Sequence, residues 1–503
     1  MKIMQVTVEV ARVEAASAEV LVLLHCEGEA LVKQDTARLD TALDGALSTL
    51  VHSKEFEGKA NEVLLYHTQG KVPAKRVVLV GLGKKSEVTT ETIRQAMGSA
   101  AKRVRQTKVE SFSVALPTVR PEGMSSLDVA QAMVEGAILG SYQFTVYRSE
   151  AASGRDVAEM RMLIPMKAQS RQVTEGIRRG VATAEATVFV RDLCNHPSNV
   201  LTPTRVADEA KAIAKAEEIA ITILDRKEME RLGMGALLGV ARGSQEPPKF
   251  IILEYNGAKK KDARPVVLVG KTITFDTGGI SLKPAENMEH MKADMTGGAE
   301  VLASIRAAAR LKLPLRLISI LPVAENMPGG RAMKPGDIVT TLSGKTVEVQ
   351  NTDAEGRLIL ADGLAYAMRY NPVALIDIAT LTGACVVALG QFAIGMFGTD
   401  DTLKERVRKA GQKSGERVWE MPLWEEYFEQ LKSDVADMRN IGGRGGGMIT
   451  AALFLSKFVG DCPWVHLDIA STDWSERERA YIPKGPTAIG TRLLVQYLID
   501  RSL

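Results

Sequence analysis

The sequence predicts a two-domain α/β protein, with a smaller N-terminal α/β domain and a larger C-terminal α/β domain whose mostly parallel central sheet is flanked by helices. At 503 residues the chain is longer than one typical hydrophobic core accommodates. Short apolar runs with strand-like composition alternate with helical stretches along its length. Its 45% hydrophobic and 25% charged residues are typical of an ordinary globular protein.

The smaller domain is expected over residues 1–170. Its strand-like runs are VTVEV, VLVLL, KRVVLVGLG and SFSVAL, and residues 90–106 have helical spacing. A connecting helix is expected over residues 171–193, because helical spacing continues there until the prolines of NHPSNVLTP end it.

The larger domain is expected over residues 194–503. The strand-like runs FIILEY, RPVVLVG, RLISILPVA and ALIDIATL are interleaved with helical stretches at 205–218, 296–311 and 357–370. Such alternation predicts parallel strands covered by helices on both faces. In sheets of this kind, ligands bind outside the carboxyl ends of the strands.

Several features favour a cytoplasmic protein that does not enter a membrane. The glutamates of the N-terminal stretch fall where an export signal needs apolar residues. Residues 374–398 are the one membrane candidate, but glycines and polar residues interrupt them, so a buried core element is expected there. The cysteines are widely spaced and form no C-x-x-C, which disfavours disulfides and thiolate zinc sites. They are Cys26, Cys194, Cys385 and Cys462.

The charge is unevenly distributed although the net charge is only +3. Residues 71–108 contain ten lysines or arginines against Glu87 and Glu91. Such a run is usually a solvated basic face, but it also keeps a nucleic-acid role open.

Four acidic residues are expected near strand ends of the larger domain. Asp276 follows the RPVVLVG strand, Asp294 precedes a helix that begins near Thr296, and Asp353 and Glu355 lie in the heptapeptide NTDAEGR. If NTDAEGR is extended, its odd-numbered residues share one side. Taken alone, a D-x-E row is more often a solvated edge, and an aspartate before a helix is more often a cap.

Gathered at one cleft, these four carboxylates would repel one another unless cations shared the site. Lys271, Lys283 and Arg357 could balance three of them without a metal. Two divalent ions would match all four, and paired metal ions are a common device for hydrolysis. A phosphate loop ending in Gly270-Lys271-Thr272 is excluded, because Pro265 occupies the position of its first glycine. The residue pattern leaves both charge-balancing schemes open.

The sequence blocks around these residues resemble the M17 peptidase family, the leucyl or cytosol aminopeptidases that include bacterial aminopeptidase A. NTDAEGRLIL is similar to the family signature, and VGKTITFDTGGISLKP, MKADMTGGA, RDLCNHPSNVLTP and NIGGRGGGMITAALFL are similar to its other blocks, in the same order. The resemblance covers residues 190–500 approximately. It implies that residues 194–503 are a metallopeptidase catalytic domain that removes leucine and other, mainly apolar, N-terminal residues from peptides.

The resemblance also implies two divalent metal ions per subunit, with Mn expected before Zn, Mg or Co. Asp276, Asp353 and Glu355 would hold one ion, with the Asp353 backbone carbonyl included, and Lys271, Asp276, Asp294 and Glu355 would hold the other. Lys271 would then have to be a neutral amine, which two adjacent dications would favour. A water shared by the two metals would be the nucleophile.

Two further residues would form the catalytic pair. Lys283 would stabilise the developing oxyanion, and the planar fork of Arg357 would hold a bicarbonate that acts as general base. The remaining residues implied by the resemblance would bind the substrate. They are Met291, Asn351, Thr380, Gly383 and Ala470.

Family resemblance further implies a homohexamer with the catalytic domains at its centre, acting in intracellular peptide turnover on substrates with a free N-terminus. Some bacterial members double as transcription or site-specific recombination factors. Sequence-specific DNA binding by the basic N-terminal domain is therefore the alternative, or an additional, function.

Overall fold

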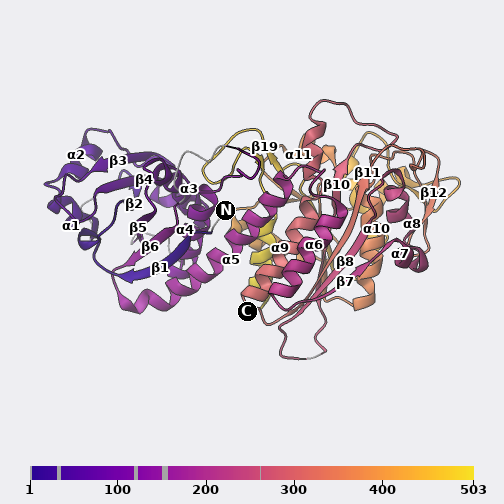
Figure 1. Ribbon diagram of the computed structural model, residues 1–503, viewed down its shortest axis with the longest axis horizontal. Helices are drawn as coiled ribbons and strands as arrows, with labels where there is room; N and C mark the ends of the chain where they lie inside the picture. Colours follow the sequence, from indigo (N-terminus) through magenta and orange to yellow (C-terminus); the bar gives the residue numbers. More distant parts are fainter. Residues whose placement is uncertain (1–2, 31–34, 118–122, 150–156, 261, 503) are drawn as a thin grey trace. The chain divides into compact units, whose positions relative to one another are not determined.

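The computed structural model describes residues 3–30, 35–117, 123–149, 157–260 and 262–502 (Figure 1). The chain divides into two compact units. The first comprises residues 1–188 and 476–484, and the second comprises residues 189–475 and 485–503. Each unit has its own sheet and its own hydrophobic core, so the predicted two-domain α/β class is confirmed.

The first unit contains a six-stranded sheet in the order β1-β6-β5-β2-β4-β3, parallel except for the β3–β4 pair. Its strands are β1 (Gln5–Val10), β2 (Leu21–Glu27), β3 (Val63–His67), β4 (Arg76–Lys84), β5 (Ser111–Ala115) and β6 (Glu159–Ile164). Its helices are α1 (Asp35–Ala42), α2 (Ala46–His52), α3 (Thr90–Gln106) and α4 (Ser126–Gly140), and α5 (Ser170–Asn195) runs on into the second unit. The predicted strands correspond to β1, β2, β4 and β5, whereas β3 and β6 were not predicted.

Helices α3 and α4 begin at capping boxes and pack closely against each other. Thr89 caps α3 together with Thr92, which explains why the predicted start of this helix is accurate. A Cβ on Gly140 would lie 2.5 Å from the carbonyl oxygen of Gly98, so neither helix tolerates a side chain at the crossing. Tyr481, from the 476–484 segment, packs on Gly98 and is buried in the core of the first unit.

The second unit is built on a nine-stranded sheet in the order β16-β15-β18-β14-β9-β11-β8-β7, with β10 paired to β11. The central strands β18, β14, β9, β11 and β10 are parallel to one another. The strands are β7 (Ala220–Leu224), β8 (Lys249–Asn256), β9 (Val266–Gly270), β10 (Thr272–Asp276), β11 (Arg316–Asn326), β14 (Ala374–Ala379), β15 (Ile394–Gly398), β16 (Val418–Glu420) and β18 (Trp464–Asp468). Smaller ladders join β12 (Ile338–Thr340), β13 (Thr346–Glu348) and β17 (Met438–Arg439), and β19 (Trp474–Ser475) with β20 (Gly485–Pro486).

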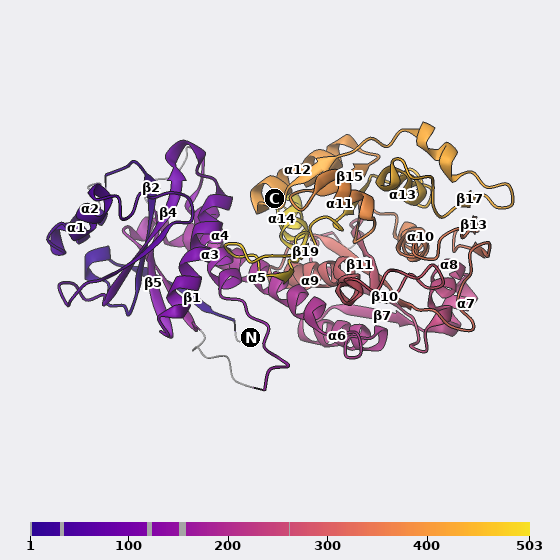
Figure 2. The same cartoon turned by 90° about the horizontal axis from the view of Figure 1, so that it is seen from above.

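Helices cover both faces of this sheet, with α6 and α9 on one face and α8 and α10 on the other (Figures 1 and 2). The helices of the unit are α6 (Pro203–Ala216), α7 (Arg226–Leu232), α8 (Gly235–Val240), α9 (Thr296–Arg310), α10 (Gly356–Ala367), α11 (Gly383–Leu389), α12 (Asp401–Ser414), α13 (Gly447–Ser456) and α14 (Thr491–Ser502). Residues 374–398 form β14, α11 and β15; the two strands are buried but much of α11 is exposed, so the prediction of a buried core element is confirmed for the strands alone. Within the described residues, no helix is both long and apolar enough to cross a bilayer.

The first turn of α9 is pressed against the carboxyl ends of two central strands. A Cβ on Gly270, at the end of β9, would lie 2.4 Å from the carbonyl oxygen of Gly297 in α9. A Cβ on Gly297 would in turn lie 2.2 Å from the carbonyl oxygen of Ile378 in β14. Glycine is therefore required at both positions, and the close approach brings the residues before α9 next to the residues after β9.

Candidate active site

Lys271 occupies the bend between β9 and β10, and its ammonium group is fully engaged. Its Nζ donates to the carbonyl oxygen of Thr380 at 2.9 Å and forms ion pairs at 2.8 Å with Asp294 Oδ1 and with Glu355 Oε1. Burial acts to lower the pKa of Lys271, but the attraction of Asp294 and Glu355 outweighs it and holds the pKa above its ordinary value. In the absence of a bound cation, Lys271 is an ammonium ion.

Asp276, the last residue of β10, is held by neutral donors and by Lys283. Its Oδ1 accepts hydrogen bonds at 2.8 Å from the backbone N–H of Gly278 and from Asn326 Nδ2. Its Oδ2 pairs with Lys283 Nζ at 2.9 Å, and the same ammonium lies 2.6 Å from Asp353 Oδ1. Burial acts to lower the pKa of Lys283, but the attraction of the two aspartates is stronger and holds the pKa above its ordinary value. Lys283 is therefore also charged.

Asp294 is not a helix cap, and the capping interpretation of this residue is wrong. Helix α9 has Met295 at its N-cap position, without a side-chain cap bond. The Asp294 carboxylate instead forms an ion pair with Lys271 and accepts a 2.7 Å hydrogen bond from Thr380 Oγ1. Burial raises its pKa well above the ordinary value, and the negative charge of Glu355 adds to this rise against the opposing effect of Lys271.

The NTDAEGR segment is a turn that leads into α10, and not the extended row considered from the sequence. Asp353 N donates to Asn351 Oδ1 at 2.9 Å, and Glu355 is already helical at φ −75 and ψ −34. Thr352, which an extended row would place on the opposite side, is fully buried and donates to the carbonyl oxygen of Gly278 at 2.6 Å. The turn, followed by the helix start, brings the carboxyl groups of Asp353 and Glu355 close together.

Asp276, Asp353 and Glu355 offer oxygens that all lie within 4.8 Å of one another. Burial raises the pKa of both Asp353 and Glu355, and Asp276 raises each further by repulsion. Among the described residues, Asp294 Oδ2 and Glu355 Oε2 are buried without a hydrogen-bond partner. Buried carboxylate oxygens without a donor are unfavourable unless a cation completes the site.

Lysines alone do not neutralise this cluster. Lys271 and Lys283 face four carboxyl groups, so two of these groups must either hold a proton or receive another cation. Arg357, the third cation of the metal-free scheme, has no carboxylate ion pair within the described chain and donates from Nη1 to the carbonyl oxygen of Asn440 at 2.7 Å. Burial lowers the pKa of Arg357 to about 10, although Glu355 and Asp468 oppose the change.

Some of the residues expected to bind substrate lie beside groups that bind Asp468, a residue that the sequence did not single out. Its Oδ1 accepts hydrogen bonds from Leu381 N and from Ala470 N, each at 3.2 Å, and its Oδ2 accepts one at 2.7 Å from Thr382 Oγ1. Ala470 thus binds this carboxylate directly, whereas Thr380 and Gly383 adjoin Leu381 and Thr382 along the chain. Met291 lies in the short 3₁₀ helix η5 (Met288–Ala293), and its carbonyl oxygen accepts from Asp294 N at 3.2 Å.

Sequence reasoning also missed two buried amides. Asn326 ends β11 and donates from Nδ2 to Asp276 Oδ1 and, at 3.0 Å, to the carbonyl oxygen of Thr352. Asn440 follows β17 and bonds to the NTDAEGR turn. A polar residue at the end of an apolar strand was the available signal for Asn326 and for Asp468, because the carboxyl ends of parallel strands form the ligand site.

A largely buried acidic cluster at the carboxyl ends of parallel strands, with oxygens left for a cation, is typical of metallohydrolases. Comparison with known families narrows this class. Residues 188–495 match the catalytic domain of the cytosol aminopeptidase family, and residues 20–151 match the N-terminal domain of the same family. The chain belongs to the cytosol aminopeptidase family, M17, and is an aminopeptidase.

Individual relatives agree along nearly the whole chain. The probable cytosol aminopeptidase of Geotalea uraniireducens is 50% identical over 461 residues, which cover 92% of each chain. That of Geobacter sulfurreducens is 47% identical over 495 residues, covering 98% of this chain and 99% of the relative. A mutant of tomato leucine aminopeptidase has a TM-score of 0.89 at 33% identity, covering 99% of this chain and 96% of its own. The bottromycin maturation enzyme BotP in complex with Mn has a TM-score of 0.85 at 35% identity, covering 97% of this chain and all of its own.

Proposed function

We propose that this aminopeptidase uses two divalent metal ions to release leucine and other, mainly apolar, residues from the N-terminus of peptides. The observation that carries the proposal is the buried carboxylate cluster, whose charge two lysines leave incompletely balanced. Asp276, Asp353 and Glu355 would hold one ion. Lys271 and Asp294, with Asp276 and Glu355 shared, would hold the other.

The donor set fits the proposed ions. Carboxylate oxygens with a single amine suit Mn, Mg, Co or Zn, and Mn is the ion we expect first. The partnerless oxygens of Asp294 and Glu355 would receive a cation without breaking a hydrogen bond to a donor in the described residues. Lys271 would have to lose the proton that its ion pairs now hold. When bound, the ions would acidify a water molecule and polarise the peptide carbonyl group.

Lys283 and Arg357 would carry the remaining steps. Lys283 keeps its proton because its pKa is raised, so it can donate a charged hydrogen bond to the oxyanion that forms when the peptide carbonyl is attacked. Arg357 is buried, with Nη1 fixed by Asn440 and Nε lacking a partner among the described residues. Its guanidinium can therefore present a donor to a bicarbonate ion that takes up the proton of the attacking water.

Met291, Asn351, Thr380, Gly383 and Ala470 would bind the first residue of the substrate. Gly383 is exposed at the start of α11, and an added Cβ would meet no atom within 4 Å, so the position is open to a ligand. We further propose a cytoplasmic homohexamer, as the resemblance implies. The four cysteines are free and buried, which suits a reducing compartment.

DNA binding by the N-terminal unit is a weaker candidate, because most of the basic run is already paired. Lys102, for example, lies 2.5 Å from Glu478 Oε1 and donates to the carbonyl oxygen of Arg479 at 3.2 Å. Six of the ten cations of residues 71–108 form such ion pairs: Lys71, Lys75, Lys84, Lys85, Arg94 and Lys102. A DNA-binding role remains a prediction, and we do not propose it.

The proposed function is tested by release of p-nitroaniline from leucine p-nitroanilide, together with elemental analysis of protein purified without a chelator. We expect about two metal ions per chain, activity with Mn, and loss of activity on chelation. Activity that survives complete removal of metal would contradict the proposal.

A further inference from the structure

We propose that Asn440 is a positioning residue of the active site. Asn440 follows β17, and its carbonyl oxygen accepts a hydrogen bond from Arg357. Its side chain binds the turn that carries Asp353 and Glu355. The inference rests on the proposed two-metal function and adds a residue through which the catalytic arginine and the metal-binding turn are held at a fixed separation.

The Asn440 side chain is fully buried and binds the turn on both sides. Its Oδ1 accepts from Gln350 N at 2.9 Å and from Asn351 N at 3.3 Å. Its Nδ2 donates to the carbonyl oxygen of Asn351 at 2.6 Å and to that of Ala354 at 3.4 Å. One side-chain amide thus binds backbone atoms of three residues, Gln350, Asn351 and Ala354.

The main chain of the same residue holds the catalytic arginine. The carbonyl oxygen of Asn440 accepts from Arg357 Nη1 at 2.7 Å, and Asn440 N donates to the carbonyl oxygen of Glu348 at 3.0 Å. Arg357 itself lies in the first turn of α10, directly after Glu355 and Gly356. The contacts therefore close a ring that runs from the turn to Arg357, from Arg357 to Asn440, and from Asn440 back to the turn.

Repulsion within the site explains why the turn needs this anchor. Asp353 and Glu355 are partly or fully buried beside Asp276, and the like charges push the turn outward whenever the site lacks its full complement of cations. The side-chain hydrogen bonds of Asn440 to the backbone of the turn oppose that displacement. Outer residues that orient metal ligands in this way usually change metal affinity or activity by about 10–100-fold when they are replaced.

Two substitutions of Asn440 test whether it positions the active site or only contributes to the stability of the fold. Asn440→Ala removes all four side-chain hydrogen bonds, and Asn440→Asp keeps the acceptor while replacing the donor with an oxygen. We expect both to lower kcat on leucine p-nitroanilide by about 10–100-fold and to weaken retention of the metal during dialysis by a similar factor. Asn440→Asp has nearly the same volume as the native residue, so it remains informative if Asn440→Ala folds poorly.

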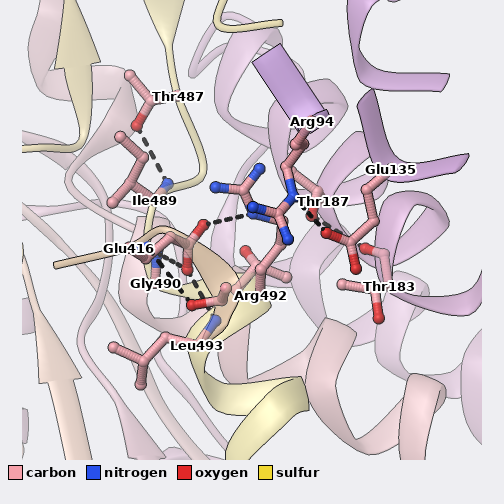
Figure 3. Close-up of polar contacts among 12 residues, drawn as sticks. Arg94, Glu135, Thr183, Thr187, Glu416, Thr487, Ile489, Gly490, Arg492 and Leu493 are labelled. Atoms are coloured by element: carbon pink, nitrogen blue, oxygen red, sulfur yellow. Dashed lines mark hydrogen bonds and ion pairs between the residues drawn. The ribbon is translucent and has the colours of Figure 1, made fainter. Parts of the chain in front are cut away.

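Thr487→Val is the matched control. Thr487 is also buried and donates from Oγ1 to the carbonyl oxygen of Thr472 at 2.6 Å. Its Oγ1 also accepts from Ile489 N at 3.1 Å (Figure 3). Among the described residues, its side chain bonds to neither the proposed metal ligands nor Arg357, so its substitution should lower the melting temperature without changing metal retention or kcat.

The decisive measurement is the Asn440→Asp substitution in an Arg357→Ala background. Because Asn440 acts partly through Arg357, its effect on kcat should be much smaller there than in the native protein. Fully multiplicative effects, or Asn440 variants that behave like Thr487→Val, would overturn the inference while leaving the proposed function intact. Native protein that binds no metal would instead overturn the proposed function itself.

Discussion

The ammonium of Lys271 lies 2.8 Å from Oε1 of Glu355 in a site where both side chains are almost completely buried. Without a metal, this lysine is a counterion. As a metal ligand it would have to be an amine. Proton and metal would therefore compete for the same atom.

Metal binding should accordingly strengthen as the pH rises. The pKa of Lys271 is raised by its carboxylate neighbours, and burial raises the pKa of Asp294, Asp353 and Glu355. Each raised pKa means that a proton must leave before the metal binds, so a fall in pH favours the metal-free form. Titration calorimetry with Mn in buffers of different ionisation enthalpy would measure the protons released. An affinity that does not vary between mildly acidic and mildly alkaline pH would contradict this expectation.

Lys283→Met should lower kcat by about 10²–10³-fold with a small change in KM, because a charged donor to the oxyanion is lost while substrate binding is kept. Metal affinity should not fall, since the ammonium that pairs with Asp276 and Asp353 is removed. Steady-state kinetics and metal titration measure the two effects. Lys334→Met is the control, because Lys334 is exposed and pairs only with Asp337 among the described residues. Equal kinetics for the two variants would rule out the role of Lys283.

Gly356→Ala should abolish activity while the fold persists. An added Cβ would lie 2.6 Å from Lys271 Cε and 2.8 Å from its Nζ, so Lys271 would be displaced from the site. Gly363→Ala in the same helix is the matched control, because its Cβ would approach only the apolar side chains of Val269 and Pro322, with Val269 Cγ1 nearest at 3.1 Å. Circular dichroism and the peptidase assay distinguish the two. A fully active Gly356→Ala variant would show that the position of Lys271 does not matter.

Asp362 should make folding stability depend on pH near neutrality. Its carboxylate is buried and accepts from Leu237 N at 2.9 Å and from Leu342 N at 2.7 Å, and burial raises its pKa to about 7. Between the unfolded value of 3.8 and about 7, the folded state binds the extra proton, so the contribution of Asp362 to stability falls as the pH rises through this window.

This pH dependence is tested by measuring the free energy of unfolding in urea for the native protein and for Asp362→Asn across this pH window. The variant should be less stable at low pH, because its NH₂ group faces one of the two backbone donors. The difference between the two proteins should shrink with rising pH, by roughly 4 kcal/mol at most. A difference that stays constant would show that Asp362 does not titrate in the folded state.

Local patterns account for how well the elements of the fold could be predicted. The helix expected over 296–311 is α9 (Thr296–Arg310), and the helix over 90–106 agrees with α3 because its cap and its apolar face lie within the segment itself. Strands β7 and β10 were not predicted, because a short strand is stabilised by its neighbours, which lie far away in the sequence.

The sequence by itself determined the α/β class, the family, and the set of charged residues that the resemblance places in the active site. It left open whether Lys271, Lys283 and Arg357 balance the carboxylates, and it suggested an extended NTDAEGR. Only the tertiary structure showed that Lys271 and Lys283 each pair with two carboxylates. It also showed that Arg357 donates to the carbonyl oxygen of Asn440 and pairs with no carboxylate among the described residues. These contacts join residues that are distant along the chain, and their geometry depends on how β9, β10, β17 and α10 pack, which no local pattern encodes.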